Sequence, residues 1–585
     1  MTDTLDPGEI REVDATTATP TLVVRKPTWE IDIEGVERAD LTPVKWQLWL
    51  SLVGLALGAV MGIAQALDRA DIDLYDALQL ENYYQGLTLH GVALAFIFTF
   101  CFANAFLSLL TMRAYGRALH RGLSQLSVTL AWLGVALAAW AILANKATVL
   151  FTFYAPLEAT PAFYIGAVLL VVSTWVVGAN IWVTHAAWRK DNPHTRTPLV
   201  AFVCQATIVM WFLASLGVAA QILVWILPWS LGWRDTVDPQ FTRILFWFTG
   251  HPIVYFWLLP VYISWYLSLP KLVKGKIYSD GLVRMVFIAF VLLIPVGIHH
   301  QFTDPGIPFT SKSVSFILTF FIFFPSTVTA FSIFASLETG GRAHGGRGLV
   351  GWIPKLPWGN PAVSGQLLAG IGFMLGGASG LINASYTINN LVHNTAFIPG
   401  HFHLTVGTGV ALSIMAVCYW MVPYLTGRAL WGRRIGVAQT WLWLIGVLTF
   451  SRGQMHGGVE GMPRRTQVSE MTVGFSEGPV DIVDAQGSSW DWSNALTAIG
   501  GTIMFVSAAL FFVVIIGTLA NSKAVEGRQE IPIGEVVHGP RRSWAILDDI
   551  KIWALIAVVL TIIVYGEVIW HYWPINSVSE GFRVW

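Results

Sequence analysis

Six histidines lie within long apolar stretches of this 585-residue chain, and their type and spacing suggest metal chemistry. They are His90, His251, the adjacent His299 and His300, and the nearby pair His401 and His403. Imidazole is costly to place in an apolar environment without a partner, and its neutral form is a common metal ligand. A single buried histidine is usually a hydrogen-bonded packing residue. Six of them in four apolar stretches indicate metal binding instead.

The two-residue spacing of His401 and His403 predicts two separate metal centres. On a helix, residues i and i+2 point about 200° apart, so these rings do not easily share one metal. Imidazole is a standard axial ligand of heme iron. With His90 as the second axial ligand, His403 would hold a six-coordinate, low-spin heme suited to electron transfer. His401 would be the only protein ligand of a second heme, whose far face would stay open to a gas.

His251, His299 and His300 remain, and a site of three imidazoles suits copper or zinc. Zinc would carry out hydrolysis. Copper beside an open heme would carry out redox chemistry on oxygen.

Composition places these histidines in a polytopic membrane protein. The chain is 55% hydrophobic and 12% charged, whereas soluble proteins carry about 25% charged residues. Thirteen apolar segments are long enough to cross a bilayer, which predicts an all-α bundle of about 13 transmembrane helices. They are approximately 46–67, 87–112, 126–145, 161–185, 199–226, 240–269, 282–302, 313–338, 361–383, 398–424, 436–456, 493–520 and 549–573. We expect 1–44 to be a polar cytoplasmic tail, 45–575 the transmembrane domain and 576–585 a short outer tail.

Lysine and arginine orient this bundle with its N-terminus in the cytoplasm and its C-terminus outside. In that orientation the inner segments hold 26 of the 35 basic residues, and the outer side holds the other nine. All six histidines then fall in the outer half of the membrane, at one depth. The expected location is the plasma membrane of a prokaryotic cell.

Other features of the composition exclude several classes of protein. The formal net charge is zero, so membrane lipid and not nucleic acid is the expected partner. All three cysteines lie in apolar runs without a CxxC motif, so neither a thiolate metal cluster nor a disulfide framework is expected. The first 44 residues lack the apolar core of a signal peptide.

The stretches around the histidines resemble those of heme-copper oxygen reductase (cytochrome c oxidase) subunit I. The matching pieces are "YYQGLTLHG" (83–91), "FTGHPIVYFWLLPVYISWY" (248–266), "GIHHQFTDPG" (297–306), "HNTAFIPGHFHL" (393–404) and "MPRR" (462–465). These pieces occur in the family's order, and the similarity covers nearly the whole chain from about residue 45. In detail they resemble the B-type (ba-three type) branch more than the commoner A-type.

The resemblance implies a subunit I bundle in which the histidines serve three metals, as the spacing argument also suggested. A low-spin heme b would be held by His90 and His403, a high-spin a-type heme by His401, and copper B by His251, His299 and His300.

Tyr255 follows His251 by four residues, so both lie on one helix face. In the oxidases the equivalent tyrosine is covalently bonded to the equivalent histidine, and its phenol can supply an electron and a proton when dioxygen is split. The resemblance therefore implies a catalytic role for both residues. Ile253 stands where A-type relatives carry a glutamate, so the second proton channel of the A-type is expected to be absent.

The resemblance also implies a single K-type proton path from the cytoplasm. Tyr262 and Tyr266 follow Tyr255 at +7 and +11, on one face of the helix. Ser326 and Thr329 lie at mid-depth on the eighth apolar segment and would continue the path. Without the resemblance, these two hydroxyls would be ordinary backbone-bonded helix residues.

Arg464 and Arg465 lie at the outer end between the eleventh and twelfth segments, and adjacent guanidiniums suit heme propionates. Lipid headgroup binding is the alternative. His393 resembles a position near the propionates of the high-spin heme. Asn389 stands where close B-type relatives are expected to carry an aspartate, which puts any proton-loading role of that carboxylate in doubt here.

The implied function is that of a terminal oxidase, which reduces dioxygen to water and takes protons from the cytoplasm, with proton pumping as a family expectation. Electrons would come from cytochrome c or a blue copper protein. Because this chain has no cysteine-rich dicopper site, a second subunit would carry one, and a small single-helix subunit is a further possible partner.

Three alternatives stay open on the sequence. A quinol oxidase of the same superfamily would look the same in this subunit. A nitric oxide reductase shares the six-histidine frame but uses non-heme iron with a nearby glutamate and lacks the tyrosine, so Tyr255 and Ile253 argue against it. A histidine-relay proton transporter would contain no heme.

Overall fold

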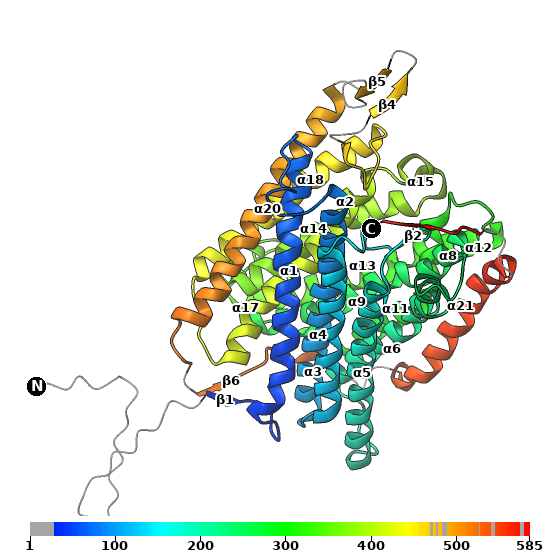
Figure 1. Cartoon of the computed structure of the whole chain (residues 1–585). Coiled ribbons are helices and arrows are strands. Elements are labelled where there is room, and N and C mark those ends of the chain that lie inside the picture. The colour runs from blue at the N-terminus through cyan, green and yellow to red at the C-terminus, as the bar shows by residue number, and fades with distance from the viewer. Residues whose placement is uncertain are drawn as a thin grey trace, which may run out of the picture.

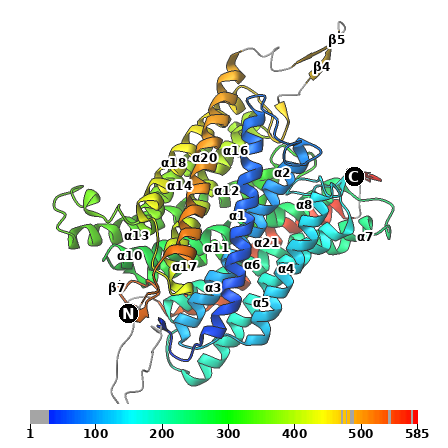
Figure 2. The ribbon, with the colours of Figure 1, turned by 60° about the vertical axis from the view of Figure 1, so that its left-hand side comes forward.

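The chain folds into a bundle of long helices, seen from two directions in a computed structural model (Figure 1, Figure 2). The structure describes residues 29–468, 472–475, 478–481, 488–525, 527–539, 544–573 and 578–584. Most of the expected polar tail, 1–44, therefore lies outside the described residues. The predicted all-α polytopic fold is confirmed, because a chain in lipid satisfies its backbone polar groups within helices.

Twenty α-helices and several tighter or wider turns of helix make up the described bundle. The α-helices are α1 Thr42–Asp68, α2 Tyr83–Val92, α3 Thr99–Tyr115, α4 Arg121–Leu143, α5 Pro161–Asp191, α6 Leu199–Ala220, α7 Leu227–Ser230, α8 Pro239–Gly250, α9 Pro252–Ile263, α10 Leu269–Leu272, α11 Asp280–Leu292, α12 Phe309–Phe321, α13 Phe323–Ala343, α14 Pro361–Ala384, α15 Tyr386–Val392, α16 Phe397–Phe402, α17 Ser413–Thr426, α18 Arg433–Val459, α20 Ser488–Asn521 and α21 Ile550–Tyr572. The 3₁₀ segments are η1 Arg38–Leu41, η5 Ile294–Gln301, η6 Ile353–Lys355 and η10 Ala545–Asp548, and the π segments are η2 Ala93–Phe98, η3 Gln221–Ile226, η4 Ser264–Ser268 and η7 His403–Leu412.

Eleven of the described helices or continuous helix runs are long and apolar enough to cross a membrane, and the bent pair α11–η5 makes a twelfth. The remaining expected segment, 436–456, lies within α18, which has 27 residues and is long enough to cross. Its polar residues, such as Gln439 and Arg452, make it less apolar than the other spans. The thirteen expected segments are therefore all helical, and eleven or twelve of them meet the criterion of length and composition.

Short pairs of β-strands lie in the loops at the two ends of the bundle. The strands are β1 Trp29–Ile31, β2 Leu157–Glu158, β3 Ile277–Ser279, β4 Thr472–Phe475, β5 Gly478–Asp481, β6 Gly527–Gln529, β7 Val536–His538 and β8 Phe582–Arg583. β1–β6, β2–β8 and β3–β7 are parallel pairs, and β4–β5 is an antiparallel hairpin beyond the upper end of the bundle in Figure 1. The three parallel pairs tie segments distant in the sequence together.

Several spans are broken where the candidate histidines lie. His251 stands between α8 and α9, just before Pro252, which lacks a backbone N–H. The span expected as 282–302 bends by 51° between α11 and η5, where Pro295 departs from helical geometry. The π segment η7 begins at His403, and π segments occur often at functional sites. These breaks turn the side chains toward the middle of the bundle.

The helix that carries His401 and His403 packs against α18 through glycines. A Cβ atom at Gly458 would lie 2.0 Å from the backbone nitrogen of Phe397, and one at Gly400 would lie 2.8 Å from the Met455 side chain. Figure 2 shows α18 and α20 running side by side along one flank of the bundle. Glycine at position 458 therefore allows α16 to sit against the α18–α20 pair.

We predict that Gly458→Ala displaces α16 and destabilises the protein by about 1–3 kcal/mol, because the new methyl group meets backbone atoms that cannot move aside. The thermal unfolding temperature of the purified protein in detergent should fall. The control is Gly566→Ala on α21, where the nearest atom to the added carbon is 3.7 Å away. Equal unfolding temperatures for the two variants would contradict the prediction.

Candidate metal and redox site

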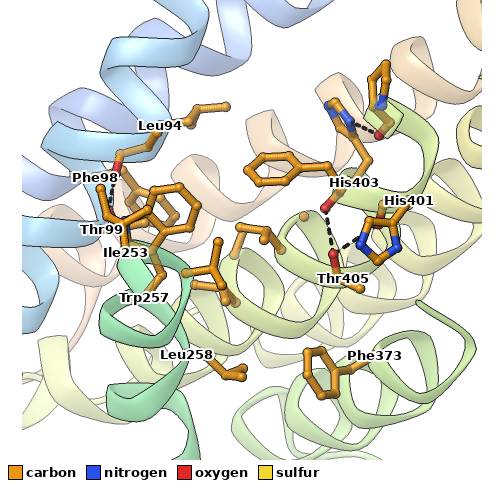
Figure 3. A pocket seen from close by; sticks show the side chains of 18 of the residues that line it. Leu94, Phe98, Thr99, Ile253, Trp257, Leu258, Phe373, His401, His403 and Thr405 are labelled. Atoms are coloured by element: carbon orange, nitrogen blue, oxygen red, sulfur yellow. Dashed lines mark hydrogen bonds between the residues drawn. The ribbon is translucent and has the colours of Figure 1, made fainter. Parts of the chain in front are cut away.

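One large cavity inside the bundle is lined by all six candidate histidines. Its volume is about 1050 Å³, at the upper end of the roughly 300–1,000 Å³ usual for ligand cavities. Figure 3 shows part of its wall, with His401 and His403 on one side and Ile253 and Trp257 on the other. The walls are mostly apolar. A cavity of this size and chemistry suits large, flat, apolar prosthetic groups.

His90 and His403 face each other across the cavity from α2 and η7. Their ring centroids are 6.2 Å apart and their planes differ by 15°. Nδ1 of His90 lies 2.8 Å from the carbonyl oxygen of Gly58, and Nδ1 of His403 lies 2.8 Å from that of Pro399. Because a carbonyl only accepts, both Nδ1 atoms must donate, which leaves Nε2 of each ring as the ligand atom.

The gap between these two rings fits one metal ion. A metal–nitrogen bond of about 2 Å on each side, added to the radius of each ring, gives roughly the observed separation of centroids. The residues present therefore fit a group with one metal and two axial imidazoles.

His401 belongs to a different part of the cavity. Its Nδ1 lies 2.8 Å from the hydroxyl oxygen of Ser379 on α14. That hydroxyl donates its own proton to the carbonyl of Gly376, so it accepts from His401 and again leaves Nε2 free. His401 is close enough to interact electrostatically with His251 and His299. The structure thus separates His401 from His403 on the two sides of one helix.

His251, His299 and His300 form a compact cluster. Their ligand atoms all lie within 4.8 Å of one another, the geometry of a metal site. Nδ1 of His251 is 3.0 Å from Nε2 of His300. Nδ1 of His299 is 3.1 Å from the hydroxyl oxygen of Thr319, whose own proton goes to the carbonyl of Ser315. His299 therefore also keeps its Nε2 for a metal.

Tyr255 is buried against this cluster. Its hydroxyl lies 3.0 Å from Nε2 of His251, while Nδ1 of the same ring faces His300. The two side chains leave α9 and its N-cap on one face, as the four-residue spacing predicted. A phenol next to a metal-ligand candidate is well placed to give a proton to a reactant at the cluster.

A series of hydroxyl groups continues from Tyr255 along α9, η4 and α13. Tyr262 lies beside Ser326 and Thr329. Tyr266 donates to the hydroxyl oxygen of Thr329 at 2.9 Å, and Thr329 donates in turn to the carbonyl of Pro325. The expected path residues are therefore brought together, although they come from segments more than 60 residues apart.

Arg464 and Arg465 lie at the upper edge of the cavity. Arg464 donates to the side-chain oxygen of Asn394 at 2.8 Å, and Arg465 donates to the hydroxyl of Thr152 at 3.2 Å. Burial, and then the charge of Arg465, lowers the pKa of the Arg464 guanidinium to about 9. Two partly buried cations that are adjacent in the chain favour a bound anionic group.

Asn389 and His393 lie near these arginines. Asn389 donates to the carbonyl of Asn383 at 2.8 Å, and its buried side-chain oxygen has no partner within the described part of the chain. Within the same residues, Nε2 of His393 and Nε of Arg464 also lack partners. Burial, and then the charge of Arg464, lowers the pKa of His393 to about 4. Nε of Arg464, and Nε2 of His393 when it carries the proton, can donate to a carboxylate-bearing group in the cavity, whereas the side-chain oxygen of Asn389 can only accept.

The structure adds residues that the sequence argument did not name. Thr319 and Ser379 orient histidines through single hydroxyl contacts, and no pattern in the sequence points to them. The ring of Trp247 stacks on His300 with centroids 3.9 Å apart and planes 9° apart. Trp247 precedes His251 by four residues, so its place on the same helix face was a signal available from spacing alone.

The chain is similar in sequence and in fold to known membrane oxidases. Residues 42–503 match the family described as Cytochrome C and Quinol oxidase polypeptide I. The chain is 40% identical over 553 residues to a cytochrome c oxidase subunit 1 of Thermus thermophilus, covering 92% of this chain and 96% of that one. Quinol oxidase subunit 1 of Sulfolobus acidocaldarius is 26% identical over 394 residues, covering 63% and 71%. A solved heme-copper terminal oxidase dimer is similar with a TM-score of 0.87, 34% identity and coverage of 94% and 96%.

We predict that Thr319→Val weakens metal binding at the three-histidine cluster by about 10–100-fold, because His299 loses the acceptor that orients its ring. The measurement is the ratio of bound metal to protein after dialysis against graded concentrations of a chelator. The matched control is Thr449→Val, whose exposed hydroxyl donates only to the carbonyl of Ile445. A metal ratio equal to that of the control would show that this hydroxyl is not needed.

Proposed function

The chain belongs to the cytochrome c and quinol oxidase polypeptide I family, the dioxygen-reducing subunit I of heme-copper terminal oxidases, and on this premise we propose that it is a B-type member with one proton path. Family membership makes it a multi-pass membrane oxidoreductase with prokaryotic relatives and argues against the proton transporter considered above. The B-type proposal is supported by Ile253, where an A-type chain would carry glutamate.

The observation that carries the proposed chemistry is the contact between Tyr255 and His251 within a cluster of three imidazoles. Copper is the metal that this donor set favours in an oxidase, because neutral imidazole suits copper and no described carboxylate joins the cluster. In this proposal His251 and Tyr255 are the catalytic pair, and His299 and His300 complete the copper site.

The two hemes are assigned by the same reasoning from ligand atoms. His90 and His403 would hold the low-spin heme b, and His401 the high-spin a-type heme, with Arg464 and Arg465 binding propionates. His393 and Asn389 would lie near the propionates of the high-spin heme. When bound, these groups carry electrons to dioxygen. The protein's own part is to hold the rings in one tautomer, exclude water with an apolar wall, and deliver protons.

Protons would reach the site through the hydroxyl series. From the expected cytoplasmic side, a proton passes along Thr329 and Tyr266 to Tyr262 and Ser326, and then to the phenol of Tyr255. Each hydroxyl both donates and accepts, so a chain of them can pass a proton without a charged side chain. Thr329 connects the two tyrosines and is the residue on which this route depends most.

The proposed reaction stores energy because electrons and protons arrive from opposite sides of the membrane. Moving one charge across the field is worth about 2.3 kcal/mol per 100 mV. This proposal keeps the N-terminus in the cytoplasm and includes proton pumping through the same single path.

An oxidase subunit I works in a complex with a subunit II. We propose that subunit II carries a dicopper site and receives electrons from cytochrome c or a blue copper protein, with a small single-helix subunit as a further partner. The similarity to a quinol oxidase subunit 1 supports a second candidate, in which quinol is the donor.

One set of measurements on the purified complex tests the proposal. Metal analysis should find copper and two hemes per chain, without non-heme iron. Reduced-minus-oxidised spectra should show a b-type band and a carbon monoxide-sensitive a-type band. Dioxygen uptake with reduced cytochrome c, but not with quinol, would support the first donor class, and the reverse result would support the second. Non-heme iron in place of copper would favour a nitric oxide reductase.

We predict that Tyr255→Phe lowers dioxygen reduction at least about 100-fold, because the phenol can no longer donate a proton. Heme spectra and copper content should stay as in the wild type. The control is Tyr164→Phe, a buried tyrosine whose hydroxyl accepts from the backbone nitrogen of Ala159. Turnover of the Tyr255 variant near the control level would remove this residue from the mechanism.

We also predict that Thr329→Val slows steady-state turnover about tenfold or more, because valine keeps the shape of threonine but cannot pass a proton. Anaerobic reduction of the hemes should be unaffected, since proton delivery and not electron supply is changed. Thr207→Val serves as the control, with a buried hydroxyl that donates only to the carbonyl of Val203. An unchanged rate would mean that protons take another route.

A further inference from the structure

The C-terminal arm, defined here as the described residues 544–573 and 578–584, lies beyond residues 42–503, the range that matches the family model. None of the six histidines comes from it. Its helix α21 nevertheless packs against α11, α12 and η5, and Figure 1 shows it in red beside α8 and α12. Segments α8 and η5 lead into or contain the three histidines of the metal cluster. The arm therefore adjoins the cluster's backbone without supplying a ligand.

Tyr565 links the arm to both of these segments. Its side chain is buried, and its hydroxyl donates to the carbonyl oxygen of Trp247 at 3.1 Å. The ring of Trp247 is the one that stacks on His300. A Cβ atom at Gly297, two residues before His299, would lie 2.0 Å from the Trp247 carbonyl and 2.5 Å from the Tyr565 hydroxyl. The hydroxyl thus sits where α8 and η5 touch.

Tyr572 makes a second contact of the same kind. Its hydroxyl donates to the carbonyl oxygen of Pro305 at 2.7 Å, and a Cβ atom at Gly306 would lie 2.1 Å from that hydroxyl. Tyr565 and Tyr572 are seven residues apart and so share one face of α21. Tyr565 bonds the backbone of α8 at Trp247 and lies close to Gly297, just before the pair His299–His300. Tyr572 bonds the backbone after that pair.

Both ends of the arm are fixed. At one end Asp548 accepts from the guanidinium of Arg284 at 2.5 Å, within a group of buried charges that includes Asp280. At the other end β8 pairs with β2, and the backbone nitrogen of Phe582 donates to the carbonyl of Pro156 at 3.1 Å. Because contacts at both ends of the arm fix the position of α21 along the bundle, the positions of Tyr565 and Tyr572 are fixed as well.

We propose that the C-terminal arm is a positioning element for the three-histidine site, with Tyr565 fixing the backbone of α8 ahead of His251 and Tyr572 fixing the backbone that follows His300. This inference rests on the proposed function, in which those histidines bind copper. Ligand atoms need to be held within about 0.5 Å of their working geometry. Two directed hydrogen bonds to backbone carbonyls, at 3.1 and 2.7 Å, are suited to that task, whereas a helix that only spans the membrane has no need of them.

The test uses the purified holo-complex with Tyr565→Phe, Tyr572→Phe and the double variant. Each change removes one hydroxyl and keeps the ring. The matched control is Tyr419→Phe, equally buried, whose hydroxyl donates to the side-chain oxygen of Gln439 at 2.8 Å between α17 and α18. The readouts are copper retained per heme after dialysis against a copper chelator, and the infrared stretching band of carbon monoxide bound at copper.

The expected result is copper loss about 10–100-fold faster in the arm variants and a shifted or broadened carbon monoxide band, with the low-spin heme spectrum unchanged. The control should behave as the wild type. If both single variants match the wild type, or if Tyr419→Phe produces the same change, the arm does not position the site. Wild-type protein that contains heme but no copper would instead contradict the proposed function.

Discussion

The site depends on how a buried imidazole is satisfied. A neutral ring has one N–H donor and one bare nitrogen, and in an apolar interior both need partners. In four of the six rings Nδ1 is committed to a protein oxygen that can only accept: the carbonyls of Gly58 and Pro399, and the hydroxyls of Ser379 and Thr319, whose own protons are already used. The remaining nitrogen of each ring is then presented to the cavity in a fixed tautomer, which suits it to bind a metal.

Broken helices are the means by which these rings converge. On an unbroken helix, neighbouring histidines would point in different directions around the helix axis and could not face the same cavity wall. The Pro295 bend in the seventh span, the α8–α9 junction at His251 and the π segment at His403 each turn the backbone at a ligand. Backbone groups released at such breaks are tolerated in a membrane protein because they face the protein interior and not lipid.

The same cavity separates opposite kinds of chemistry along its length. At one end the guanidiniums of Arg464 and Arg465, with His393 nearby, favour a bound anion. In the middle lie the metal-ligand candidates, and beyond Tyr255 the uncharged hydroxyls of Tyr262, Tyr266 and Thr329 continue away from them. This order suits a reaction in which charge must be held near one face while protons arrive from the other. Helix α21 of the C-terminal arm packs on the side of the cluster where α8 and η5 meet.

Residue types and spacing were sufficient to predict the membrane class, nearly all spans and the division of the histidines among separate centres, because hydropathy and helical periodicity are local properties. The four-residue spacing of His251 and Tyr255 was likewise readable, since one helix face carries both. Tertiary structure alone decided which oxygen atom accepts from Nδ1 in four of the rings. It also decided that Trp247 stacks on His300 and accepts a hydrogen bond from Tyr565. The hydrogen bond between Tyr266 and Thr329 is a third contact of this kind. Those contacts join segments far apart in the chain, and the packing of helices against one another, not any local pattern, brings them within hydrogen-bonding distance.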